Sequence, residues 1–214
     1  MDTNDCNQLL KLNHMLDKIY IVVFLVLYFI IVFIFPTVRV KRKTGIIAYV
    51  FSNTDSLQDY IRKVLTLINF LIFFTVLANL FPDVYQYLMP GRWLEVSVLK
   101  YTGFILTHVA LLWIVIAEVQ MGNSWRIGID LSTKTELKTR GLFSISRNPV
   151  FLGMLITLAG IFLILPNAIS LLILVASIWI IQIQVRLEEE YLAKKHGKNY
   201  TEYCKNVGRW FKIN

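Results

Sequence analysis

The sequence predicts an all-α, polytopic membrane helix bundle with about five transmembrane helices. Hydrophobic residues make up 56% of its 214 residues, and the mean hydropathy is +0.58. Both values exceed those typical of a soluble domain. The apolar residues gather in five runs separated by polar stretches, and such runs are the signature of membrane-spanning helices. Since no internal repeat is present, a single membrane domain is the simplest organisation.

Five helices are predicted in order along the chain. The first spans Ile19 to Phe35 and is expected to end at Pro36, because proline removes a backbone donor and clashes inside a helix. It lacks the cationic start and the cleavage site of a signal peptide, so we expect it to be retained. The other four are predicted at residues 64–80, 98–117, 149–165 and 168–185.

The last two predicted helices form a hairpin, because only Pro166 and Asn167 separate them. Five spans place the two termini on opposite sides of the membrane. Eighteen of the 22 Lys and Arg residues, among them Arg126, Lys134 and Lys212, lie in segments 36–63 and 118–149 and in the tail from Arg186. The positive-inside rule therefore predicts an outside N-terminus and a cytoplasmic C-terminal tail.

The composition also excludes several classes of protein. A net charge of +8 would suggest nucleic-acid binding in a soluble protein, but here the basic residues follow the predicted topology. Two cysteines and three scattered histidines predict neither a disulfide framework nor a metal site. The chain contains no G-x-G, so a soluble dinucleotide-binding cradle is not expected.

A polar, glycine-bounded turn from Gly141 to Gly153 leads into the fourth predicted helix. Asn148 should be extended, since it precedes a proline, and Pro149 should be the first helical residue. Unpaired backbone N–H groups and the positive end of the helix dipole would then lie beside Arg147 and favour an anionic group. The alternative is an ordinary helix cap in which Arg147 extends to the interface.

A second polar cluster follows the fifth predicted span. The helix is expected to continue through Glu188, Glu189 and Glu190 and to stop at Gly197. The hairpin should bring this end beside the start of the preceding helix, so we expect Arg147 and Glu188 to lie near each other. A solvated helix face with ordinary ion pairs is the alternative for this charge run.

These two clusters together resemble a known family signature. They are similar to the C-terminal motifs of isoprenylcysteine carboxyl methyltransferases and related phospholipid methyltransferases. The similarity lies, in order, in the triplet Arg147-Asn148-Pro149 with the run to Gly153, the paired glutamates from Glu188, and the segment from Gly197 to Tyr203. The resemblance covers roughly residues 120–210 as an ordered set of motifs. It does not extend to the first three predicted spans.

The resemblance implies an enzyme, an S-adenosylmethionine-dependent methyltransferase embedded in the membrane. The cofactor would enter from the cytoplasm, and a lipophilic substrate would enter from the bilayer. By the resemblance, the cofactor-binding residues are Leu137, Gly141, Phe143, Arg147, Asn148, Pro149 and Glu188. Residues 118–214 would form the cofactor-binding and catalytic region, and residues 1–117 the three N-terminal spans.

The chain departs from the family pattern at two positions. Asn148 replaces the usual histidine, and Phe151 replaces the usual tyrosine. Asparagine keeps a donor and an acceptor but carries no charge near neutral pH, and phenylalanine lacks the hydroxyl.

The resemblance fits more than one methyl acceptor. For carboxyl O-methylation of an isoprenylcysteine-type substrate, Arg186 is the candidate to hold the carboxylate. For an N-methyltransferase acting on a phospholipid amine, Glu188 or Glu189 is the candidate base.

Two other readings of the chain compete with methyl transfer. One is an NADPH-dependent membrane reductase, because sterol reductases share part of the C-terminal signature. The other is a non-catalytic membrane protein whose basic tail docks on anionic lipid.

Overall fold

A computed structural model of the protein describes residues 3–45, 57–125 and 136–211. Arg126, Lys134 and Lys212 lie outside the described residues. The α-helices are α1 (Thr3–Phe29), α2 (Phe35–Thr44), α3 (Leu57–Ala78), α4 (Pro82–Tyr85), α5 (Ser97–Met121), α6 (Pro149–Ile164), α7 (Ala168–His196) and α8 (Lys198–Asn206). One π-helical segment, Ile30–Ile34, joins α1 to α2, and short 3-10 turns lie at Gln86–Leu88, Arg92–Leu94, Gly122–Ser124 and Gly141–Ser144. The described residues contain no strand.

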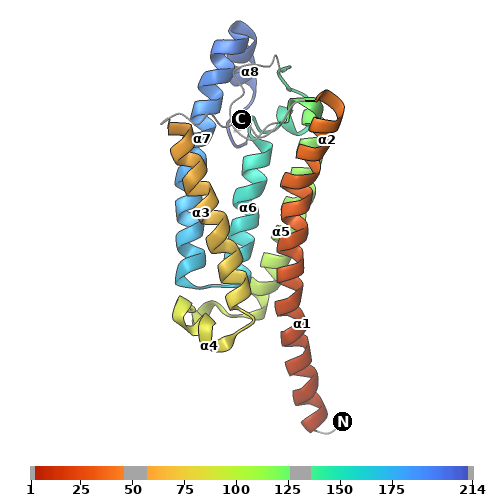
Figure 1. Ribbon diagram of the computed structural model, residues 1–214, viewed down its shortest axis with the longest axis vertical. Coiled ribbons are helices and arrows are strands. Elements are labelled where there is room, and N and C mark those ends of the chain that lie inside the picture. Colours follow the sequence, from red (N-terminus) through yellow and green to blue (C-terminus); the bar gives the residue numbers. More distant parts are fainter. Residues whose placement is uncertain (1–2, 46–56, 126–135, 212–214) are drawn as a thin grey trace.

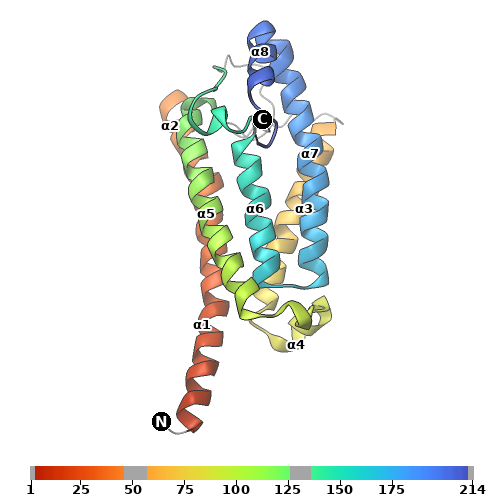
Figure 2. The ribbon, with the colours of Figure 1, turned by 180° about the vertical axis from the view of Figure 1, so that it is seen from behind.

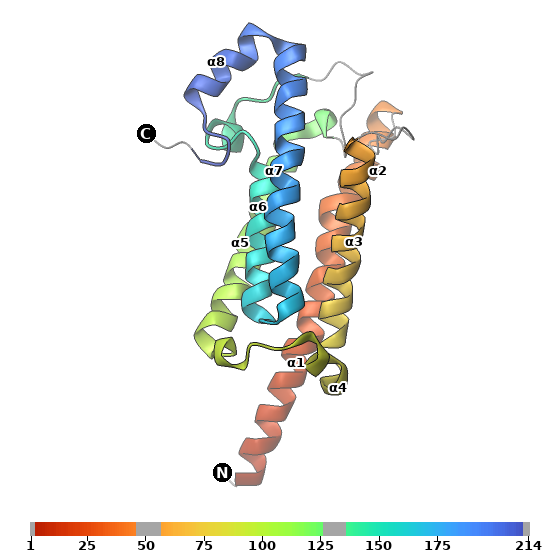
Figure 3. The same cartoon turned by 90° about the vertical axis from the view of Figure 1, so that its left-hand side faces the viewer.

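The long helices form an elongated bundle in which successive passes of the chain run between two ends (Figure 1). Seen from behind, α6 lies between α5 and α7, and α1 runs beside α5 (Figure 2). The side view shows α3 beside α1 (Figure 3). The main apolar core joins residues of α1, α3, α5, α6 and α7.

Among the described residues, four helical segments are long and apolar enough to cross a membrane, namely residues 15–44, 57–78, 97–121 and 168–196. The fifth, α6, is apolar but has only 16 residues, which corresponds to about 24 Å of helix against a hydrocarbon core of about 30 Å. The prediction of a polytopic helical bundle with five passes is confirmed.

The predicted end of the first helix at Pro36 is wrong. The helix continues without interruption to Thr44, and the residues immediately before the proline, Ile30–Ile34, form a π-helical segment. A wider turn changes the backbone pairing ahead of the proline, which lacks an N–H and would otherwise clash with the preceding turn. The basic residues Lys41 to Lys43 therefore lie in the last turn of a continuous helix.

The predicted hairpin between α6 and α7 is confirmed. Asn167 caps α7 in a reciprocal capping box with Ser170, whose N–H donates to the Asn167 side chain at 2.9 Å. The turn is also tied to the connection between α3 and α5, because Gly91 N donates to Pro166 O at 2.8 Å. This end of the bundle is therefore closed by backbone contacts.

The other end of the bundle gathers the polar segments. In Figure 1, α2, the start of α3, the end of α5, the start of α6 and α8 all lie at this end. This end also holds the described parts of the three predicted basic segments, which are residues 36–63, residues 118–149 and the tail. α7 extends past the start of α6 and ends at Gly197, as predicted, with φ +50°.

Candidate functional site

The turn before α6 has the predicted backbone. Asn148 is non-helical, with φ −129° and ψ 55°, and Pro149 is the first residue of α6. The Asn148 N–H donates to Ser146 Oγ at 3.1 Å, and the buried Ser146 hydroxyl donates to Arg209 O at 3.3 Å. A C-terminal segment that is distant in sequence therefore holds this turn in place.

Gly141 positions the start of the same segment against α5. Its φ is +66°, in the left-handed region that favours glycine, and a Cβ there would overlap the side-chain amide of Gln120. The next residue, Leu142, donates its N–H to Gln120 Oε1 at 2.8 Å. The absence of a side chain at Gly141 thus permits a contact that fixes the segment on α5.

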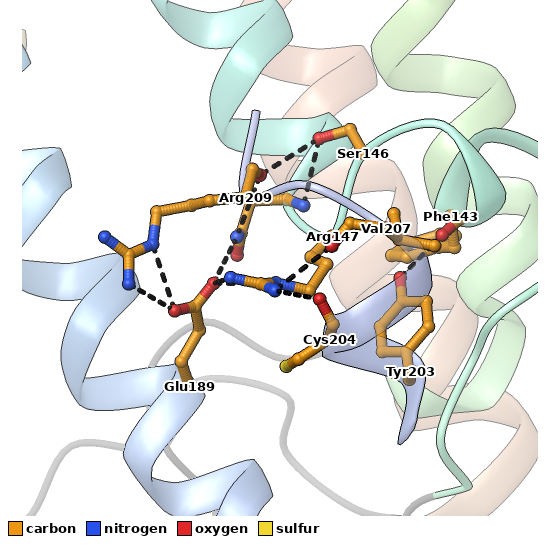
Figure 4. Close-up of polar contacts among 9 residues, drawn as sticks. Phe143, Ser146, Arg147, Glu189, Tyr203, Cys204, Val207 and Arg209 are labelled. Atoms are coloured by element: carbon orange, nitrogen blue, oxygen red, sulfur yellow. Dashed lines mark hydrogen bonds and ion pairs between the residues drawn. The ribbon is translucent and has the colours of Figure 1, made fainter. Parts of the chain in front are cut away.

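Glu189 is the centre of an ion cluster at the start of α6 (Figure 4). Arg147 donates to Oε1 from Nε at 3.1 Å and pairs with it through Nη2 at 3.0 Å, and Asn148 Nδ2 donates to the same oxygen at 3.2 Å. Arg209 pairs with Oε2 at 2.7 Å. The side chains of Arg147 and Glu189 are only 12% and 11% exposed, so this pairing is shielded from solvent screening.

The C-terminal tail completes the binding of Arg147. Arg147 Nη1 donates to the carbonyl oxygens of Val207 at 3.1 Å and Cys204 at 3.3 Å, and the Arg147 backbone N–H donates to Gly208 O at 3.1 Å. Tyr203 donates its hydroxyl to Phe143 O at 2.6 Å, as Figure 4 shows. Burial raises the pKa of Tyr203, which keeps this hydroxyl protonated.

A cavity of about 590 Å³ opens beside this cluster. At its polar end lie Arg62, Arg147, Asn148 and Glu188, and apolar side chains from α1, α3 and α6 make up most of its wall. Both arginines already have carboxylate partners, since Arg62 pairs with Asp59. Among the described residues, Glu188 makes no hydrogen bond or ion pair, so its carboxylate is available to a ligand. A pocket of this size, apolar with a few polar groups at one end, is typical of small-molecule sites.

The structure separates the predicted site residues into two groups. Phe143, Arg147, Asn148, Pro149 and Glu188 line the cavity. The others do not line it: Gly141 contacts α5, Leu137 packs on the tyrosines of α8, Glu189 holds the tail, and Arg186 is exposed.

Arg147 and Glu188 converge on one site, as expected, but do not pair with each other. Both line the same cavity, but the ion-pair partner of Arg147 is Glu189. Adjacent helical residues are about 100° apart around the axis, so Glu189 faces the start of α6 and the tail while Glu188 faces the cavity. The Asn148 amide donates to Glu189, so a neutral donor serves at the position where the family has histidine.

Sequence reasoning missed several residues that build the site. Arg209 and Gln120 make specific contacts here but belong to no recognisable local pattern. Gln184 and Asn69 also line the cavity. The spacing of Gln184 and Glu188, four residues apart on one helix, was the available signal for the first of these.

Comparison with known families agrees with this geometry. The apolar helices of the fold indicate a multi-pass membrane protein, and its cavity reaches the end of the bundle where the polar segments gather. Residues 98–199, slightly less than half of the chain, match the family model described as phospholipid methyltransferase. The match runs from the start of α5 to the start of α8, and it confirms the resemblance carried by the sequence motifs. The matched family is one of methyltransferases, for which S-adenosylmethionine is the implied methyl donor. No curated protein matches the chain.

Proposed function

We propose that the protein transfers a methyl group from S-adenosylmethionine to a lipophilic acceptor that enters from the bilayer. One observation carries the proposal: Arg147, Asn148, Pro149 and Glu188 form the polar end of a cavity whose remaining wall is largely apolar. Such a site suits a polar cofactor and an apolar acceptor. The cofactor can bind at the polar end without entering the hydrocarbon, and the acceptor can bind along the apolar wall without entering water.

The residues at the polar end fit the cofactor. The first turn of α6 has no side-chain cap on its backbone N–H groups, and a helix N-terminus favours a carboxylate. Glu188 offers an unpaired carboxylate to an ammonium group. We therefore assign the amino-acid part of the cofactor to Glu188 and the start of α6.

The cofactor supplies an electrophilic methyl group on a sulfonium, and the protein supplies position and exclusion of water. Phe143 and Phe151 add apolar surface to the cavity wall. Glu189 acts on the site indirectly, because it holds Arg147 and Asn148 in place through hydrogen bonds.

Two acceptors are consistent with this site. The resemblance to isoprenylcysteine carboxyl methyltransferases suggests a carboxylate, with Arg186 as its binding residue. However, Arg186 is exposed and does not line the cavity, while Arg62 and Arg147 are already paired. These features support a phospholipid-type amine as the second candidate, since an amine needs no free arginine to hold it.

We further propose that the polar end of the bundle faces the cytoplasm, where S-adenosylmethionine would be available. Eighteen of the 22 Lys and Arg residues belong to segments on that side of the predicted topology. The N-terminus would then lie outside.

Calorimetric titration of the detergent-purified protein with S-adenosylhomocysteine, and separately with NADPH, tests this proposal. We expect micromolar binding of the first ligand and no binding of the second. Glu188→Gln should weaken binding by roughly tenfold or more, because a charge-assisted hydrogen bond is lost. Glu190→Gln, which changes an exposed neighbour, is the matched control.

Each other outcome leads to a different conclusion. Full binding by the Glu188→Gln variant would overturn the role of that residue. NADPH binding alone would indicate a reductase. Binding of neither ligand would leave a lipid-docking protein as the better reading.

A further inference from the structure

α7 presents a polar stripe to the cavity below Glu188. Ser177, Ile181, Gln184 and Glu188 all line the cavity, and their spacing of four, three and four residues places them on one helix face. The separation of eleven positions between Ser177 and Glu188 corresponds to about 16 Å of helix. The stripe thus leads from the polar end of the cavity deep into the membrane-spanning part of the bundle.

The uncharged polar groups of this stripe have no partners within the described part of the chain. Ser177 is 1% exposed, and its Oγ makes no hydrogen bond. Within the same described residues, neither the buried Gln184 nor Asn69, which reaches the cavity from α3, makes a side-chain hydrogen bond. Two facing helices therefore supply donors and acceptors to the same cavity.

A purely hydrocarbon ligand would leave these groups unpaired. A buried hydroxyl or amide without a partner is destabilising, and polar side chains within membrane spans normally face a binding cavity or a partner. A ligand oxygen at this depth would satisfy Ser177 and Asn69, since both side chains can donate and accept.

We propose that Ser177 and Asn69 form a second polar subsite that binds a hydroxyl or carbonyl oxygen in the middle of the acceptor's chain. The acceptor is then an oxygenated long-chain lipid, with this oxygen about 16 Å from the group held near Glu188. The inference rests on the proposed function, because the methyl-accepting end is assigned to the polar end of the same cavity.

The alternative explanation is that Ser177 is only a small residue at a helix contact. Thr75 of α3 provides the comparison. It is also 1% exposed with an unpartnered hydroxyl, but it does not line the cavity. If Ser177 belongs to a ligand subsite, replacing it should change ligand binding and replacing Thr75 should not. If both residues only pack between helices, the two replacements should have similar effects.

The test uses octadecylamine and an analogue with a hydroxyl group about 16 Å along the extended chain from the amine. Apparent dissociation constants for both amines are measured on the full-length protein in nanodiscs. The ratio of the two constants is compared among the wild type, Ser177→Ala, Asn69→Ala and Thr75→Val. Partitioning of each amine into the bilayer is the same for every protein, so it cancels when the ratios are compared.

We expect the wild type to prefer the hydroxylated amine and Ser177→Ala to reduce this preference by roughly two- to tenfold, as for one hydrogen bond. Asn69→Ala should act in the same direction, and Thr75→Val should leave the ratio unchanged. Equal ratios for the wild type and Ser177→Ala would overturn the subsite, even if Asn69→Ala does not fold.

S-adenosylhomocysteine binding is measured on the same four proteins. Wild-type protein that fails to bind it contradicts the proposed methyl transfer, whatever the amine ratios show. Normal binding in Ser177→Ala together with a changed ratio places the effect at the second subsite.

Discussion

Arg209 donates two hydrogen bonds to a single carboxylate oxygen of Glu189, from Nε at 3.0 Å and from Nη2 at 2.7 Å. The other oxygen accepts from Arg147 and Asn148. The hydrogen bonds from Arg209 to Glu189 raise the pKa of the guanidinium, so the pair stays charged. Glu189 is therefore occupied by contacts within the protein, whereas the adjacent Glu188 lines the cavity.

Glu189→Gln should destabilise the protein by about 2–4 kcal/mol, because it leaves two partly buried arginines without their carboxylate. Thermal unfolding in detergent measures the change as a lowered midpoint. Glu190→Gln alters an exposed side chain and should shift stability by less than about 0.5 kcal/mol. Equal midpoints for the two variants would contradict the central role of Glu189.

Arg209→Met should release the tail from α7. The Arg209 side chain is 34% exposed, so solvent screening limits the expected loss to about 1 kcal/mol. Limited proteolysis should cut the variant near residues 207–211 faster than the wild type. Arg209→Lys keeps the charge but not the two-donor geometry, and it should give an intermediate rate. Identical rates in all three proteins would show that the tail is held by other contacts.

Gly141→Ala should disturb the start of the cofactor-binding segment. The new methyl group must displace Gln120, which breaks its hydrogen bond to Leu142, and the positive φ adds a backbone cost of about 1 kcal/mol. Gly45→Ala is the matched control, since Gly45 has φ +71° with open space around it. We expect Gly141→Ala to lose roughly 1–2 kcal/mol more than the control. Similar melting midpoints for both would mean that Gln120 moves without cost.

The proposed orientation can be tested with single cysteines. Gln8 and Glu202 are exposed near opposite termini. In a chain without Cys6 and Cys204, a membrane-impermeant maleimide should label a Gln8→Cys variant on intact cells. A Glu202→Cys variant should react only after permeabilisation. The opposite pattern would place the polar end of the bundle outside.

The features predicted well from sequence depend on short-range physics. Apolar run length gave the five passes, and the two-residue link gave the hairpin. Proline geometry placed Asn148 outside α6 and Pro149 at its first position. Each of these rules needs only neighbouring residues.

The features that were missed depend on contacts between distant segments. Nothing near Arg209 in the sequence shows that it binds Glu189, and nothing near Gln120 shows that it supports Leu142. The choice between Glu188 and Glu189 as the cavity residue likewise depends on where the tail lies. Adjacent identical residues cannot be distinguished by pattern alone.

The π-helical segment at Ile30–Ile34 has a consequence for the contact between α2 and α5. Arg39, which follows it, donates to the carbonyl oxygens of Glu118 at 3.0 Å and Gly122 at 3.4 Å, at the C-terminal end of α5. One extra residue in a turn changes the phase of everything after it by about 100°. Deleting a single residue from Ile30–Ile34 would restore ordinary helix but turn Arg39 away from α5. The π-helical turn therefore fixes the rotation of α2 about its axis, so that Arg39 faces the end of α5.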